Sequence, residues 1–120
     1  MFETISLMIY SIFLQFCLVL MLATGSWAAL ATEKSEFNLV IRNHKFEPAQ
    51  LTIPAQQKVL IIIDNQDNTS EEFESHELNR EKVIPGLNKA KIFIGPLQAG
   101  TYSFFGDFHQ DSAQGTLLVK

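Results

Sequence analysis

Hydrophobic and polar residues alternate along most of the chain after residue 35. The clearest case is residues 37–42, FNLVIR, where every second side chain is apolar. A period of two is typical of a β-strand with one buried face. The same alternation, together with short β-branched runs, predicts strands at residues 37–42, 59–63, 91–94, 101–105 and 116–119.

Turn-forming residues separate these predicted strands. Asn, Asp, Pro and Gly gather at residues 64–68, 85–86, 95–96 and 99–100. Between them, only residues 80–83 have the composition for a single helical turn. Many short strands at close spacing predict a small all-β sandwich with Greek-key connections.

The start of the chain differs from the rest in being almost uniformly apolar. Residues 6–23 form an apolar run that is short for a membrane span, and residues 29–31 supply an A-x-A cleavage signal. We therefore expect residues 1–31 to be a secretory signal peptide and residues 32–120 to be the mature domain. The run is preceded by Glu3 and by no Lys or Arg, so a retained N-terminal anchor stays open as the alternative.

Length and charge narrow the range of partners. The mature part has the length of one domain with a modest core. The whole chain carries a net charge of -4, and the loss of Glu3 with the leader makes the mature part slightly less acidic. No basic stripe is present to neutralise phosphates, so we expect no nucleic acid partner. A metal cation or a basic partner surface fits this charge better.

Soft metal ligands are confined to the predicted leader. The one cysteine is Cys17, and the three methionines are Met1, Met8 and Met21. A mature domain without thiol or thioether groups has no disulfide and lacks the ligands that favour Cu(I). Imidazole and carboxylate ligands suit Cu(II) and harder ions such as iron.

The last 21 residues, GTYSFFGDFHQDSAQGTLLVK, have the outline of a copper-ligand loop. A blue-copper domain closes with a strand of the form G-x-Y-x-F/Y-x, a Cys, a short loop with a His and often a Met, and then G-x-L/V-x-V. Here Gly106 stands at the place of the Cys, His109 at that of the loop His, and Gln114 near that of the axial Met. This segment resembles the cupredoxin family. Because a blue-copper carrier needs the thiolate of a His₂Cys site, the chain is not expected to be one.

Further segments extend the resemblance over roughly residues 36–120. Residues 46–59, FEPAQLTIPAQQKV, resemble the cupredoxin opening, and residues 60–67, LIIIDNQD, resemble the strand that leads to the first ligand region. Residues 71–86, EEFESHELNREKVIPG, look like the cupredoxin-like subfamily of bacterial periplasmic iron-uptake systems. The resemblance implies a cupredoxin-like Greek-key β-sandwich in the periplasm. It also implies work alongside a membrane iron permease and other periplasmic uptake components.

All three histidines fall in or beside segments that cupredoxins bring together at one end of the sandwich. His76 follows the LIIIDNQD strand, His109 lies in the last loop, and His44 precedes the FEP motif. The metal-site candidates also include carboxylates. In an extended segment Glu72, Glu74 and His76 project to one side, whereas Phe73 and Ser75 project to the other.

Asp107, two residues before His109, adds another carboxylate oxygen. The expected metal ligands are therefore His109, His76, Glu74, Asp107, His44 and Glu72, and the expected cofactor is a copper or iron ion. The alternative for the acidic residues is a solvated edge that blocks sheet pairing.

Three functions stay open at this point. The first is a periplasmic metal-binding protein that acts in iron uptake with a membrane permease. The second is copper-dependent Fe(II) oxidation or electron transfer, and the third is a metal-free cupredoxin-like interaction module.

Overall fold

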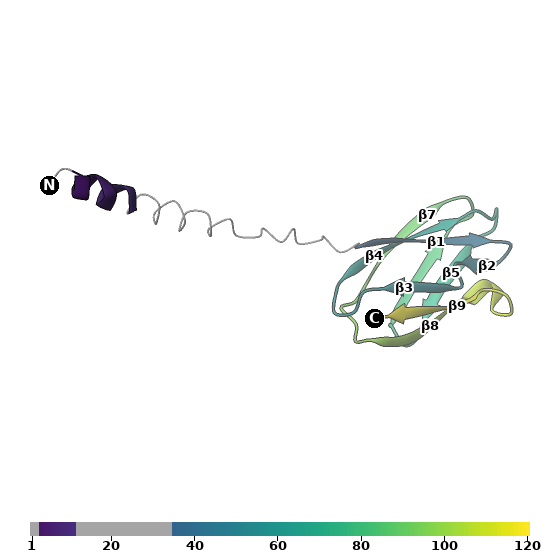
Figure 1. The fold of residues 1–120 in the computed structure, drawn as a ribbon. Helices are drawn as coiled ribbons and strands as arrows, with labels where there is room; N and C mark the ends of the chain where they lie inside the picture. The colour runs from purple at the N-terminus through teal and green to yellow at the C-terminus, as the bar shows by residue number, and fades with distance from the viewer. Residues whose placement is uncertain (1–2, 12–34) are drawn as a thin grey trace. The chain divides into compact units, whose positions relative to one another are not determined.

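The computed structural model describes residues 3–11 and 35–120 of the chain (Figure 1). The chain divides into two compact units, Met1–Thr32 and Glu33–Lys120. The described part of the first unit is a helix over residues 3–11, and most of the predicted signal peptide lies outside the described residues. Within the described ranges, no helix is both long enough and apolar enough to cross a membrane.

The described part of the second unit, residues 35–120, contains nine strands and one 3₁₀ turn, and most of the strands are labelled in Figure 1. In chain order these are β1 (Glu36–Arg42), β2 (Lys45–Glu47), β3 (Gln50–Ile53), β4 (Val59–Asn65), β5 (Glu71–Ser75), β6 (Arg80–Ile84), β7 (Lys89–Ile94), β8 (Gly100–Gly106), η1 (Asp107–His109) and β9 (Gln114–Val119). One sheet has the order β2-β1-β4-β7, and the other has the order β3-β9-β8-β5-β6. Each sheet contains one parallel pair, β1 with β4 and β3 with β9, and is otherwise antiparallel.

The predicted all-β sandwich is confirmed, and its core comes from the alternation in the sequence. In β4 every second side chain is buried, beginning with Val59 and ending with Asn65. The strands β3 and β7 alternate in the same way, and the inward side chains of both sheets form one hydrophobic cluster. Burial of one face of each sheet is the main source of stability in such a domain.

Four strands lie outside the five predicted segments: β2, β3, β5 and β6. All are five residues or fewer, and charged residues interrupt three of them. The helical turn considered for residues 80–83 is instead the edge strand β6. Its pairing with β5, from Glu71↔Ile84 to Ser75↔Arg80, supplies backbone hydrogen bonds that the local sequence does not reveal.

Three phenylalanines join the two sheets near the end of the sandwich that holds η1. Phe73 and Phe104 stack with ring centroids 5.0 Å apart. Phe46 meets both edge-on, at 6.1 Å and 5.0 Å. Such aromatic pairs add stability beyond their buried area. The three strands β2, β5 and β8 are thereby held together.

We expect Phe104→Ala to lower the free energy of unfolding by about 3–5 kcal/mol, because it leaves a cavity inside this cluster. Phe93→Ala is the matched control, since Phe93 is half exposed, with the Lys58 ammonium 4.7 Å from its ring centroid. Its cost should stay below about 1 kcal/mol. Urea denaturation measures both values, and equal losses would show that the cluster does not support the fold.

Candidate metal centre

Three side chains from distant parts of the sequence converge at one end of the sandwich. They are His44 in the turn between β1 and β2, Glu71 at the first position of β5, and His109 at the end of η1. Figure 1 shows the yellow-green loop that contains η1 beside β2 and β5. One ligand-type atom from each of the three residues lies within 4.8 Å of the other two.

Glu71 is the most deeply buried member of this group, at 1% exposure. Its Oε1 accepts hydrogen bonds from the backbone N–H groups of Glu72 and Phe108, both at 3.0 Å. Its Oε2 lies 2.5 Å from Nδ1 of His109. A carboxylate removed from water is costly unless a positive charge and hydrogen bonds compensate it. Two backbone N–H groups and the His109 ring supply these hydrogen bonds, and a bound cation would stabilise the carboxylate further.

The two imidazole rings lie face to face. The centroids of His44 and His109 are 3.6 Å apart, with an angle of 12° between the planes. Nδ1 of each ring faces a carboxylate, Glu71 for His109 and Asp67, at 3.5 Å, for His44. The Asp67 carboxylate beside Nδ1 of His44 is of the kind that fixes the orientation of a ligand ring and raises its basicity. Both rings are partly exposed, so an ion can reach them from solvent.

Asp67 shapes the turn that carries His44. Asn43 and His44 both have positive φ, 52° and 55°, a conformation that costs energy in residues other than glycine. The Asp67 carboxylate accepts hydrogen bonds from both of their backbone N–H groups, at 2.8 Å and 2.9 Å. Burial by itself raises the pKa of Asp67, but these hydrogen bonds and the charges of His44 and His109 outweigh it and lower the pKa.

The loop that presents Asp67 is itself tied down by a buried amide. Asn65 is fully buried, and its Nδ2 donates to the carbonyl oxygens of Thr69 at 2.8 Å and Ile84 at 3.0 Å. Its Oδ1 accepts from the backbone N–H of Asp67 at 3.1 Å. A second tie reaches His44 from the last loop, where the Ser112 hydroxyl donates to the His44 carbonyl at 2.7 Å. The ligand-type side chains thus rest on a connected hydrogen-bond network.

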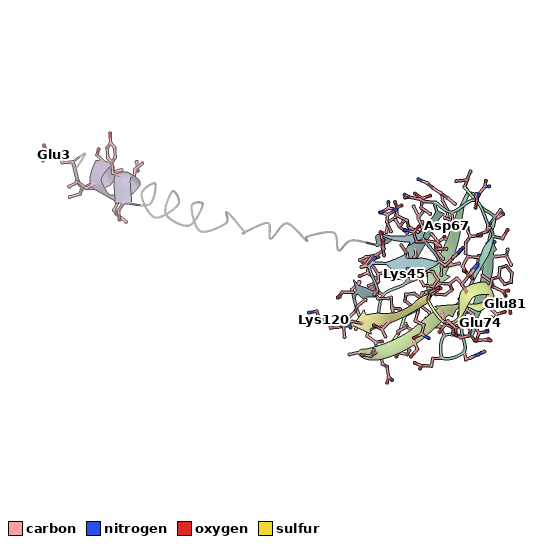
Figure 2. All side chains as sticks on the ribbon, turned by 90° about the vertical axis from the view of Figure 1, so that its right-hand side faces the viewer. Glu3, Lys45, Asp67, Glu74, Glu81 and Lys120 are labelled. Atoms are coloured by element: carbon pink, nitrogen blue, oxygen red, sulfur yellow. The ribbon has the colours of Figure 1, made fainter. Side chains whose placement is uncertain are left out.

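A separate acidic cluster lies on the β5–β6 pair and is formed by Glu72 and Glu74 of β5 and Glu81 of β6. Glu74 lies opposite Glu81 across the β5–β6 pair, and Figure 2 labels both at the edge of the domain. Partial burial raises the pKa of Glu72, followed by a hydrogen bond and charge from Glu81 and the charges of Asp107 and Glu74. His76 is largely exposed, with Nδ1 3.4 Å from Glu74.

Of the six residues expected from the sequence, the structure brings His44 and His109 together. Glu72 and Glu74 lie on the opposite side of β5 from Glu71, and His76 lies beside Glu74 rather than beside His109. Asp107 accepts a hydrogen bond from the Gln110 side chain at 2.8 Å. The two candidate groups therefore occupy two faces of one strand.

Glu71 was not among the expected ligands. The alternation of side chains along the strand could have identified it, because Glu71 shares the inward face of β5 with Phe73 and Ser75. The sequence interpretation placed the metal on the polar face of this segment. A carboxylate at the first position of an inward face lies at the end of the sandwich, where the loops of other strands can reach it.

A groove on the domain surface does not coincide with this site. This groove of about 590 Å³ lies along β8 and β9, and its lining includes Ser103, Phe105 and Thr116 but no His, Asp or Glu. The lining of this groove therefore offers no metal ligand of the imidazole or carboxylate type. The cluster of His44, Glu71 and His109 is the better candidate for a metal site.

Comparison with known proteins shows which family the chain is similar to. The profile of the cupredoxin-like domain family matches residues 15–119. An uncharacterized protein of Rickettsia prowazekii (strain Madrid E) is 46% identical over 85 residues, which cover 71% of this chain and 68% of that protein.

Solved structures share the fold at low sequence identity. The metal-binding domain of the Cu(I)-exporting P-type ATPase CopA of Streptococcus pneumoniae, solved with Cu(I), has a TM-score of 0.61 at 15% identity, covering 71% of this chain and 84% of that one. Auracyanin A, a blue copper protein of Chloroflexus aurantiacus, has a TM-score of 0.61 at 17% identity, covering 71% and 98%. With the family match and the sandwich topology together, the chain belongs to the cupredoxin-like domain family.

Proposed function

We propose that this protein binds one copper or iron ion at His44, Glu71 and His109. The observation that carries the proposal is the convergence of one ligand-type atom from each residue to within 4.8 Å. Donor atoms that share one ion at bond lengths of about 2.0–2.2 Å lie at most about 4.4 Å apart. Only a small adjustment of the three side chains is therefore needed.

The donor set favours an oxidised or hard ion. Two imidazole nitrogens and a carboxylate suit Cu(II) and iron, whereas Cu(I) prefers thiolate and thioether ligands. No cysteine or methionine occurs after residue 31 to provide them. Copper is favoured among these ions, because the CopA domain and auracyanin A, both similar in fold, are named for copper.

The cellular role we propose is metal handling in the periplasm, in iron uptake with a membrane permease. Support comes from the leader-like apolar run and from residues 71–86, which resemble the iron-uptake subfamily. The surface position of the two imidazoles also supports it, since an ion bound there is accessible to a partner.

The first test compares two histidines. Purified residues 32–120 should bind one Cu(II), and His109→Ala should weaken binding at least about tenfold, or about 1.4 kcal/mol. His76→Ala is the matched control and should bind as the wild type does, because its ring lies beside Glu74 on the other face of β5. Isothermal titration with Cu(II) and with Fe(III) measures both variants. Equal affinity of His109→Ala and wild type would exclude this site, and no retained metal would favour the interaction module.

The second test concerns Asp67, which touches no ion but holds the His44 turn. We expect Asp67→Ala to weaken Cu(II) binding by about tenfold, the usual effect of losing a group that orients a ligand. Asp67→Asn keeps one acceptor oxygen and should lose less. Unchanged affinity in Asp67→Ala would show that the turn holds its shape without the carboxylate.

Asp67 also makes stability depend on pH. Its folded pKa is below its usual value, so its contribution is complete above about pH 4 and is lost as pH falls through the folded pKa. The difference in unfolding free energy between wild type and Asp67→Asn should therefore shrink in acid. A difference that grows in acid would contradict this assignment.

The cellular role has its own test. Cells of the source organism that lack this gene should take up less iron under iron limitation, and the wild-type gene should restore uptake. His109→Ala should fail to restore it, whereas His76→Ala should succeed. Normal iron uptake in the deletion strain would disprove the role and leave the metal site itself intact.

A further inference from the structure

Gly106 forms the wall of the site against Glu71, with no room for a side chain. A Cβ atom at this position would lie 2.7 Å from Cδ and 2.8 Å from Oε1 of Glu71, and 2.6 Å from Cβ of Ala113. Carbon contacts this short essentially never occur, so a neighbour would have to move. Glycine is required here by space and not by backbone conformation, since φ is -91°.

Neither the Gly106 backbone nor the Glu71 carboxylate can easily move away from this contact. The Gly106 N–H donates to the Ala113 carbonyl at 2.8 Å, and Gly106 pairs with Phe73 in the β5–β8 ladder. On the other side, two backbone N–H groups hold Oε1 of Glu71, and His109 holds Oε2. The carboxylate therefore occupies the volume into which a residue at position 106 would project.

We propose that Glu71 is the residue that determines which oxidation state the site selects, because its carboxylate fills the space of the position-106 side chain and supplies the anionic donor there. This inference rests on the metal site proposed above. Blue-copper centres combine two imidazoles with a cysteine thiolate. In this chain two imidazoles stand with a carboxylate, and a thiolate at position 106 is sterically excluded while Glu71 is present.

The consequence is a preference for Cu(II) over Cu(I). A carboxylate and a thiolate carry the same charge, so the difference between the two centres is in softness. Hard oxygen donors stabilise Cu(II) relative to Cu(I), whereas a thiolate stabilises both. The site is thereby specialised to hold an oxidised ion and to pass it on, instead of cycling it between oxidation states.

The steric part is tested on the metal-free protein. Gly106→Ala should lower the urea midpoint strongly in the wild type and equally in a Glu71→Gln background, because glutamine keeps the shape of glutamate. In a Glu71→Ala background the same substitution should lower the midpoint less, since one of the two clashes is removed. The Ala113 contact is common to all three backgrounds and cancels. An equal loss in all backgrounds would overturn the claim that Glu71 fills this space.

The chemical part is tested by affinity for both oxidation states. We expect Glu71→Gln to weaken Cu(II) binding at least about tenfold and Cu(I) binding much less, so that the Cu(II)-to-Cu(I) affinity ratio falls. Glu74→Gln, on the outer face of the same strand, should leave the ratio unchanged. Competition titrations with chelators of Cu(II) and of Cu(I) measure it. If the wild type binds Cu(II) but Glu71→Gln has the same Cu(II)-to-Cu(I) affinity ratio, the role of Glu71 in selectivity is disproved, and the proposed metal site is not. Binding of neither ion by the wild type would overturn the proposed function and the selectivity together.

Discussion

A single buried carboxylate, that of Glu71, is the constraint on which the rest of the site depends. A charge that is 1% exposed must be compensated within the protein. Two backbone N–H groups and the His109 ring supply that compensation, and they bring η1 against the start of β5. The same carboxylate excludes any side chain at Gly106. The η1 turn, the Glu71–His109 pair and Gly106 therefore depend on one another.

The hydrophobic core positions this arrangement through strand geometry. In β5, Phe73 follows Glu71 by two residues, so the two side chains share one face, and in β8, Phe104 precedes Gly106 by two. Phe46 is the middle residue of β2, which begins directly after the His44 turn. The three rings pack on one another beneath the site. Packing that stabilises the sandwich therefore also helps to fix the separation of the candidate ligands His44, Glu71 and His109.

The glutamates on the two faces of β5 differ in burial and in their partners. Inward, one carboxylate is buried and paired with imidazole, which suits it to an ion stripped of most of its water. Outward, Glu72, Glu74 and Glu81 repel one another at an edge that remains in contact with solvent. A row of like charges on an edge pair also discourages pairing with other sheets. The inner face is thus suited to binding and the outer face to solubility.

The sequence alone determined the class of fold and the lack of soft metal ligands after residue 31. Period-two alternation marks strands with one buried face, and the positions of cysteine and methionine before residue 31 leave residues 32–120 without thiolate or thioether groups. His44 and His109 were also reachable from the sequence, because the resemblance placed both near ligand regions. The short strands β2, β3, β5 and β6 were not predicted. The strands β3 and β5 pair with the distant strands β9 and β8, and β2 and β6 are short hairpin partners whose charged residues obscure the alternation.

Only the tertiary structure singled out Glu71 and separated it from Glu72 and Glu74. Alternation shows which residues share a face, but it does not show which face meets the loops of other strands. That depends on how β2, β5 and η1 are brought to the same end by the crossings between the two sheets. A glutamate on an inward face looks unfavourable in the sequence, and it becomes a candidate ligand only because a distant histidine and two backbone N–H groups surround it.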